Sequence, residues 1–233
     1  MQGILLVDKP AGWTSFDVVN YVRRIVATAE GKKPKNCKVG HTGTLDPFAT
    51  GLLILLIGKE YTKRASELSK LDKTYKVTMK LGQTSTTGDP EGEISEIVGN
   101  MSAPNKDQIE PAFEEFRGEI EQIPPVFSAI KIDGQRAYNL ARAGKEVVMQ
   151  PRKVTINRLE IINYNYPEVK YVADVSSGTY IRTLSEDIAR ILGTGAYTTD
   201  LRRTSVSTYS VEDAVSVDGL NAEIIANNLR KSL

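Results

Sequence analysis

The first hydrophobic segments of the chain predict a short strand followed by an amphipathic helix. Residues 4–7 are all aliphatic, and the turn-forming sequence Asp-Lys-Pro-Ala-Gly follows at residues 8–12. Thr14 and an acidic residue three positions later resemble a capping box, which marks the start of a helix. Apolar residues then recur at spacings of three and four, the period of one helix face: Phe16, Val19, Val22 and Val26. We therefore expect these side chains to face the core.

The central part of the chain shows two strand patterns and one loop pattern. Residues 52–57 form a continuous apolar run between two glycines, which predicts a strand buried on both faces. From Tyr75 to Leu81 every second residue is apolar, and this alternation predicts a half-buried strand. Residues 84–92 are polar, contain Gly and Pro, and are expected to form a loop.

The rest of the chain adds helices and strands in irregular order. Helices, each followed closely by a glycine, are predicted at residues 109–116, 137–143 and 184–191. Extended segments are predicted at residues 126–132, 154–162, 171–176 and 206–211, with a helix-like tail after residue 218. Strands outnumber helices without alternating regularly with them, so an α+β fold fits better than a doubly wound sheet. The sequence shows no linker that would mark a domain boundary.

Composition places the chain among globular proteins without a strong overall charge. Of its 233 residues, 40% are apolar and 25% charged, which is enough to bury a core. The net charge of +1 excludes a globally basic nucleic-acid binder, so RNA contacts must come from local patches. One cysteine excludes an internal disulfide, and one histidine makes a His/Cys metal site implausible. Without a long apolar run or a signal peptide, a cytoplasmic location is expected.

The densest unusual segment is the Gly- and Thr-rich loop of residues 40–51. Three glycines and Pro47 fix its backbone path, and it carries His41 and Asp46 just before the buried strand. A carboxylate held there by a rigid scaffold is well placed to act as a nucleophile. Residue type alone favours another interpretation, an Asx-turn in which Asp46 binds its own backbone while His41 is an ordinary loop hydrogen-bonding group.

This loop and six further segments resemble one known family. The sequence Gly-His-Thr-Gly-Thr-Leu-Asp-Pro-x-Ala-x-Gly resembles the signature of TruB-type tRNA pseudouridine-55 synthases. Further motifs of that family match in order, at residues 8–15, 72–75, 84–92, 124–142, 178–184 and 201–204. The resemblance spans roughly residues 3 to 211, nearly the whole chain.

The resemblance implies a fold, a reaction and a partner. The fold would be the pseudouridine-synthase α+β fold, a mixed, mainly antiparallel sheet with flanking helices and an active-site cleft across the sheet. Residues 1–211 would form the catalytic domain, and residues 212–233 a helical tail without the PUA-like domain that most members carry. The reaction would convert uridine to pseudouridine at position 55 in the T-loop of tRNA. It needs no cofactor and no metal, and we expect no membrane and no obligatory protein partner.

The resemblance also assigns the central catalytic residues. Asp46 would be the essential carboxylate, which either attacks the sugar or assists a glycal route; the residues do not distinguish the two. Arg182 would pair with Asp46 and keep it ionised, whereas by residue type it reads as an exposed strand cation. Tyr75 would stack on the target base and help the final deprotonation, whereas its alternating strand predicts core packing.

Four more residues would contact the substrate. Tyr180 and Leu201 would line the base pocket, and Lys63 would lie near the site. His41 would help to displace a neighbouring nucleotide as the target flips out of the RNA.

Charge is distributed in zones that suggest how RNA is bound. Residues 23–38 and 131–153 are basic, and residues 107–121 are acidic. Two basic zones beside the predicted site loops suggest a phosphate-binding surface for the T-arm of tRNA. An alternative is a tRNA-folding chaperone with weak or no catalysis. A further alternative is a glycosidase-like hydrolase with Asp46 and Asp89 as paired carboxylates.

Overall fold

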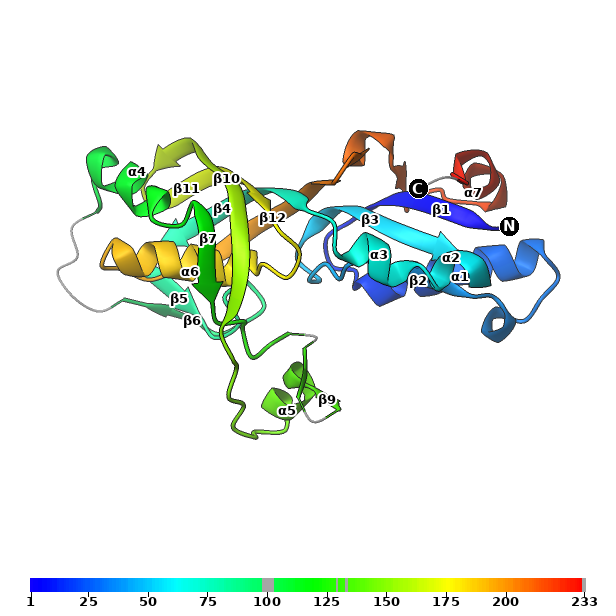
Figure 1. Cartoon of the computed structure of the whole chain (residues 1–233), viewed down its shortest axis with the longest axis horizontal. Helices are drawn as coiled ribbons and strands as arrows, with labels where there is room; N and C mark the ends of the chain where they lie inside the picture. The colour runs from blue at the N-terminus through cyan, green and yellow to red at the C-terminus, as the bar shows by residue number, and fades with distance from the viewer. Residues whose placement is uncertain (98–102, 129, 133, 232–233) are drawn as a thin grey trace. The chain divides into compact units, whose positions relative to one another are not determined.

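The computed structural model describes residues 1–97, 103–128, 130–132 and 134–231, without the side chains of Lys131, Arg136 and Arg142. The chain forms two compact units (Figure 1): the first combines Met1–Lys76 with the residues from 201 onward, and the second is Val77–Asp200. The chain passes between the units inside two strands, β4 (Lys73–Leu81) and β12 (Ala196–Val206). Because these crossings lie within strands, no Gly- or Pro-rich linker marks them. The predicted extent of the catalytic domain, residues 1–211, stays a prediction.

The first unit contains a sheet with the strand order β14-β1-β3-β12, in which β2 also pairs with β3 and β13 with β12. Besides β4 and β12, the strands of this unit are β1 (Gly3–Lys9), β2 (Val39–His41), β3 (Thr50–Ile57), β13 (Tyr209–Ser210) and β14 (Val215–Ser216). Its helices are α1 (Ser15–Ala29), α2 (Lys59–Thr62), α3 (Ala65–Ser69) and α7 (Ala222–Asn228), with 3-10 turns η1 (Pro34–Asn36) and η2 (Val211–Asp213). Strand β3 is antiparallel to β1 and β2 and parallel to β12.

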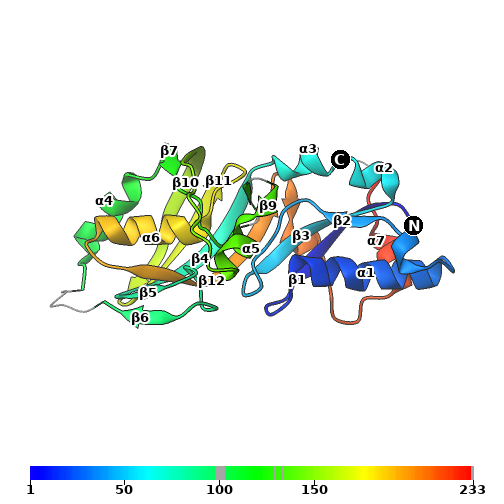
Figure 2. The same cartoon turned by 90° about the horizontal axis from the view of Figure 1, so that it is seen from below.

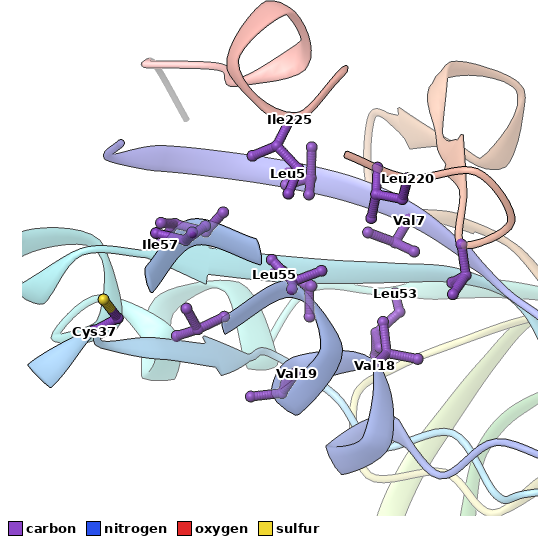
Figure 3. Close-up of a cluster of buried hydrophobic side chains, with 14 of the residues drawn as sticks. Leu5, Val7, Val18, Val19, Cys37, Leu53, Leu55, Ile57, Leu220 and Ile225 are labelled. Atoms are coloured by element: carbon purple, nitrogen blue, oxygen red, sulfur yellow. The ribbon is translucent and has the colours of Figure 1, made fainter. Parts of the chain in front are cut away.

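Strands β1 and β3 divide their side chains between two apolar clusters. Leu53 and Leu55 join the cluster that also contains Val18 and Val19 of α1, as Figure 3 shows. The alternate residues of β3 enter a second cluster together with Val206 of β12. All residues of β3 from position 51 to 57 are buried, so the predicted strand buried on both faces is confirmed.

Helix α1 lies along the sheet of the first unit (Figure 2) and begins with the predicted capping box. The expected place of Phe16 on its apolar face is wrong, because this side chain is 58% exposed. The buried face includes Val18, Val19 and Val22, and one turn before Val19 it is Ser15, rather than Phe16, that is buried.

The second unit is built on a sheet with the order β12-β4-β11-β10-β7. Besides β4 and β12, the second unit contains the strands β5 (Gln83–Ser85), β6 (Ile94–Glu96), β7 (Gly118–Gln122), β8 (Lys131–Ile132), β9 (Gln135–Arg136), β10 (Arg152–Asn165) and β11 (Glu168–Val175). Strands β5 and β6 pair with each other, as do β8 and β9, outside the main sheet. Its helices are α4 (Lys106–Glu114), α5 (Ala137–Arg142) and α6 (Ile181–Ile191). Strand β10 is antiparallel to β11 and β7. Helices α4 and α6 pack on this sheet, where the Phe113 and Tyr171 rings meet edge to face with their centroids 5.3 Å apart.

The predicted α+β class is confirmed, but several element boundaries are wrong. The strand expected at residues 206–211 is interrupted: Val206 ends β12, a turn with Ser207 at a φ of 50° follows, and only Tyr209–Ser210 continues as β13. Strand β12 has many polar residues and was not predicted as a strand. The loop expected at residues 84–92 begins inside β5, and among the described residues of the segment 126–132 only Lys131–Ile132 forms a strand. Within the described residues, no helix combines the length and apolar character that crossing a bilayer requires.

Candidate active site

The loop that carries Asp46 connects two paired strands of the first unit. It leaves β2 at His41, which pairs with Leu55 of β3, and the Thr42 amide donates to the Ile54 carbonyl at 3.2 Å. The Ala49 amide donates to the carbonyl of Asp46 at 3.1 Å, which closes a turn at the tip of the loop. Asp46 is partly exposed at this turn, immediately before the buried strand, as predicted.

The segment after β1 holds the residue that follows Asp46. The carbonyl of Pro47 accepts hydrogen bonds from the Gly12 amide at 2.9 Å and from the Lys9 ammonium at 3.2 Å. The same ammonium donates to the carbonyls of Pro10 and Trp13 at 2.9 and 2.6 Å. Lys9 is fully buried, and a buried cation is tolerated only when acceptors satisfy it in this way.

Ser15 holds the residue that precedes Asp46. Its hydroxyl accepts a hydrogen bond from the Leu45 amide at 2.8 Å and donates to the Leu45 carbonyl at 3.1 Å. This side chain is only 2% exposed. The backbone of the residues on both sides of Asp46 is therefore held by the Asp-Lys-Pro-Ala-Gly-Trp-Thr-Ser segment at residues 8–15, which gives that motif a structural role.

Arg203 of β12 supports the loop from another side. Its Nε donates to the carbonyl of Leu52 at 2.7 Å and its Nη2 to that of Gly43 at 3.1 Å, and the residue is 2% exposed. Gly51 has a φ of +102°, and a Cβ there would lie 2.8 Å from the Arg203 backbone nitrogen. Glycine is thus required at this position by both conformation and close approach.

Lys73 is a second buried cation beside the same loop. Its ammonium donates to the carbonyls of Ser69, at 3.0 Å, and of Leu71. Burial, followed by the nearby charge of Arg203, lowers the pKa of Lys73 to about 8. A Cβ at Gly43 would lie 3.4 Å from Arg203 Nη1 and 3.8 Å from Lys73 Cε, so the two cations flank this part of the loop.

The first unit also contains four other residues of the predicted site. His41 ends β2 and is partly exposed, whereas Tyr75 on β4 and Leu201 on β12 are 7% and 5% exposed. Tyr75 is buried as core packing would require, and its stacking role stays a prediction. Lys63 lies just after α2, exposed to solvent, where its ammonium pairs with the Glu60 carboxylate at 3.0 Å. A surface ion pair of this kind gives Lys63 no visible link to the Asp46 loop.

Arg182 lies in the first turn of α6 in the second unit. Its guanidinium donates to the carbonyls of Thr87 at 2.6 Å and Phe127 at 3.0 Å, and lies 3.3 Å from the Asp89 carboxylate. The residue is 4% exposed, so its interpretation from residue type as an exposed strand cation is wrong. The reason is that the backbone carbonyls of Thr87 and Phe127, from two different loops, supply the guanidinium with acceptors away from solvent.

Asp89 is part of this arrangement. One of its carboxylate oxygens faces Arg182, and the other accepts from the Thr87 hydroxyl at 2.5 Å and the Glu91 amide at 3.0 Å. A carboxylate committed to three donors is poorly suited to the acid–base role that the hydrolase alternative requires. Nearby Glu186 has its pKa raised by burial, an effect that the charge of Arg182 partly offsets.

Tyr180, the residue before α6, is positioned through its backbone. The side-chain amide of Gln122 accepts from the Tyr180 amide at 2.8 Å and donates to its carbonyl at 3.1 Å. Gln122 itself is 2% exposed. The start of α6 is thereby held by one side chain from β7. Asp46 and Arg182 belong to different units, and their pairing stays a prediction.

Several supporting residues were not singled out from the sequence. Lys9, Ser15, Lys73 and Arg203 all lie inside segments that carry the family resemblance, so the motifs contained the signal. Gln122 lies outside every motif, and no pattern in the sequence points to it. Among the described residues, no cluster of three or more His, Cys, Asp and Glu side chains is arranged to hold a metal ion.

The two predicted basic zones differ in what the structure describes. Residues 23–38 belong to the first unit, in α1 and the segment around η1. In the zone 131–153 of the second unit, three cationic side chains lie outside the described part of the chain. Of the others, Lys145 is exposed and Lys153 pairs with Glu119 at 2.8 Å.

Comparison with protein families gives two adjoining matches. The model of the TruB family pseudouridylate synthase N-terminal domain matches residues 30–181. The model of the tRNA pseudouridylate synthase B C-terminal domain matches residues 182–233.

Individual relatives agree with these matches. A tRNA pseudouridine synthase B of Aquifex aeolicus is 45% identical over 94% of this chain and 73% of its own length. A protein of the same name in Pseudomonas fluorescens is 46% identical over 95% of this chain and 69% of its own length. Among solved structures, a chain in the crystal structure of a Cbf5-Nop10-Gar1 complex matches with a TM-score of 0.72 and 26% identity, over 98% of this chain and 60% of that chain.

Proposed function

Because the chain belongs to the TruB family of pseudouridylate synthases, we propose that it converts uridine to pseudouridine at position 55 in the T-loop of tRNA. Its relatives named tRNA pseudouridine synthase B support pseudouridine formation in tRNA, and the position in the T-loop is the more specific part of the proposal. The main observation in support of this proposal is that hydrogen bonds hold the loop around Asp46 in place. Lys9 and Ser15 bind the backbone of the residues on either side of Asp46, which itself stays partly exposed.

The reaction rearranges bonds within one nucleotide. In the proposed step, the Asp46 carboxylate bonds to C1′ of the target uridine as the bond between N1 and C1′ breaks. The released base turns, C5 bonds to C1′, and the carboxylate leaves again. C5 then loses its proton and N1 gains one, so the composition of the nucleotide is unchanged and no cofactor is consumed. A nucleophile held in one orientation lowers the barrier because little freedom is lost at the moment of reaction.

The target base must leave the helical stack of the RNA before Asp46 can reach its sugar. In the proposal Tyr75 stacks on the extruded base, Tyr180 and Leu201 line its pocket, and His41 displaces a neighbouring nucleotide. The two hydrogen bonds between the Gln122 side chain and the Tyr180 backbone support the proposed place of Tyr180 in the wall of that pocket. Pairing of Arg182 with Asp46 belongs to the same proposal. Lys63 has the weakest support, since the structure places it in a surface ion pair with Glu60.

The proposal is tested by incubating the chain with tRNA transcribed without modifications and mapping pseudouridine at single-nucleotide resolution. The expected product is pseudouridine at position 55 alone, and a transcript with cytidine at this position should give none. Absence of pseudouridine despite intact tRNA binding would contradict the proposal and favour the tRNA-folding chaperone. Release of free uracil would instead favour the hydrolase.

A further inference from the structure

An open pocket of about 540 Å³ lies in the first unit between α1 and the segment around η1. Its volume falls in the range of ordinary ligand sites. Its main lining residues are Asn20, Arg23, Arg24, Lys35, Lys38 and Val39. Part of the lining is fixed by packing, because Cys37 and Val39 also belong to the apolar cluster of α1 and the sheet, in which Figure 3 shows Cys37.

The pocket concentrates positive charge without a compensating carboxylate. Its lining includes four cations, Arg23, Arg24, Lys35 and Lys38, and no acidic residue. Within the described part of the chain, none of these four forms an ion pair, whereas neighbouring Lys32 pairs with Glu30 at 2.8 Å. Like charges around one hollow repel each other, and a bound anion relieves that repulsion. The charge pattern therefore indicates an anionic ligand.

Arg23 is already oriented for such a ligand. Its Nη2 donates to the Val39 carbonyl at 3.0 Å and its Nη1 to the Asn20 side chain at 2.7 Å. The guanidinium also lies 5.8 Å from the centroid of the Phe16 ring. These contacts hold the planar group in place while other N–H donors stay available, which favours phosphate recognition.

Phe16 distinguishes a nucleic acid from a small inorganic anion. It lies one helical turn before Asn20 on the same face of α1 and is 58% exposed. An exposed aromatic ring beside a basic hollow is the combination with which proteins bind single-stranded RNA, since bases stack on the ring while cations hold the phosphates. An inorganic anion would gain nothing from the ring.

We propose that this pocket binds a phosphodiester group of the RNA substrate, with an adjacent base stacked on Phe16. The inference rests on the proposed function, which supplies the RNA. Strand β2 runs from Val39 in the pocket wall to His41 at the start of the Asp46 loop. One wall of the phosphate site and the start of the catalytic loop thus belong to the same strand, so binding here anchors the RNA next to the element that carries the chemistry.

The test compares two triple variants of the full chain with equal loss of charge. Arg24→Gln, Lys35→Gln and Lys38→Gln together remove exposed pocket cations whose side chains form no hydrogen bond or ion pair within the described residues. Lys59→Gln, Lys70→Gln and Lys106→Gln form the control, because these lysines are also exposed and have no ion-pair partner among the described residues, but lie outside the pocket. Binding of unmodified tRNA is measured directly between low and moderate salt, independently of catalysis.

The pocket variant is expected to weaken binding about tenfold or more and to reduce the slope of log affinity against log salt by about 1 to 2, while the control keeps the wild-type slope. Equal slopes for the two variants would overturn the proposal.

Phe16→Leu should weaken binding of a short single-stranded RNA about tenfold. Inorganic phosphate that competes as strongly as this RNA would identify a free-anion site instead. If the wild-type chain makes no pseudouridine but the slopes differ, the proposed function fails and the RNA-binding pocket stands.

Discussion

The loop that carries Asp46 and the start of α6 that carries Arg182 are both held tightly, but by opposite arrangements. The loop receives hydrogen bonds from outside: Lys9, Ser15 and Arg203 all donate to its carbonyls. At α6 the functional side chain itself is the donor, and Arg182 reaches out to the carbonyls of neighbouring loops. A loop has no repeating backbone pattern to satisfy its peptide groups, whereas a helix lacks partners only at its ends. Supporting residues should therefore matter most for the loop.

The largest stability effect is expected at Lys9. Replacing it in Lys9→Met removes a buried charged donor from three carbonyls, including that of Pro47 next to Asp46. The free energy of unfolding should fall by about 4 kcal/mol, because each hydrogen bond to a charged group contributes about 1.5 to 3 kcal/mol and acceptors are left unsatisfied. Urea denaturation measures this change. Pseudouridine formation should also fall at temperatures where the variant stays folded.

A matched lysine provides the control for this variant. Lys63→Met removes the exposed ion pair with Glu60, and pairs of this kind contribute at most about 1 kcal/mol. Similar losses of unfolding free energy in the Lys9 and Lys63 variants would contradict the role of Lys9 in holding the Asp46 loop.

The buried cation at Lys73 should make stability depend on pH. Its pKa is lowered to about 8 in the folded protein, from an ordinary value of 10.5. Between these values the unfolded chain binds more protons than the folded one, so stability rises with pH across this window and loses that gain as pH falls towards 8. The unfolding free energy of the wild type relative to Lys73→Met should rise by about 2 kcal/mol from pH 8 to pH 10. A flat difference would show that Lys73 keeps an ordinary pKa, and a falling one that its pKa is raised; either result would contradict this prediction.

Loss of the Ser15 hydroxyl should have an intermediate effect. Ser15→Ala leaves the Leu45 amide without its side-chain acceptor in a buried place, which should cost about 2 kcal/mol. Ser69→Ala is the matched change at an exposed hydroxyl, where water replaces the lost bond and the cost should stay below about 0.5 kcal/mol. Equal unfolding midpoints for the two alanine variants would argue against a stabilising role of the hydrogen bonds between Ser15 and Leu45.

The corresponding change at α6 should be smaller. Gln122→Met removes both bonds to the Tyr180 backbone but keeps the volume of the side chain. Because Tyr180 is partly exposed, water can replace part of the lost hydrogen bonding to its backbone. We therefore expect the free energy of unfolding to fall by about 1 kcal/mol and the KM for tRNA to rise. A stability loss as large as that of Lys9→Met would remove the contrast between the two regions.

The sequence pattern predicted the elements whose environment is simple. The apolar run at residues 52–57 is a strand buried on both faces because each of its side chains meets an apolar cluster. Phe16 was misplaced because its position in the helical period is taken by Ser15, whose burial depends on a hydrogen bond to a distant loop. A local period cannot contain that information.

The site was predictable to the extent that motifs carry it. The Asp46 loop stands out through its glycines and proline, but the residues that hold it are charged or polar groups of types that are mostly exposed. Nothing in the residue type of Lys9 indicates complete burial, and nothing near Gln122 indicates that it binds a backbone 58 positions away. Such contacts follow from the packing of distant segments, which a single sequence does not express as a period or a turn.

The role of Asp46 as the nucleophile is tested most directly by the single-turnover rate of pseudouridine formation with saturating unmodified tRNA, measured for the wild type and for Asp46→Asn. The substitution keeps the size of the side chain and the clamped backbone but removes the nucleophilic carboxylate. We expect the rate to fall about 1,000-fold or more, with tRNA affinity and unfolding midpoint unchanged. A variant that retains a rate within about tenfold of the wild type would contradict the assignment of Asp46 as the nucleophile.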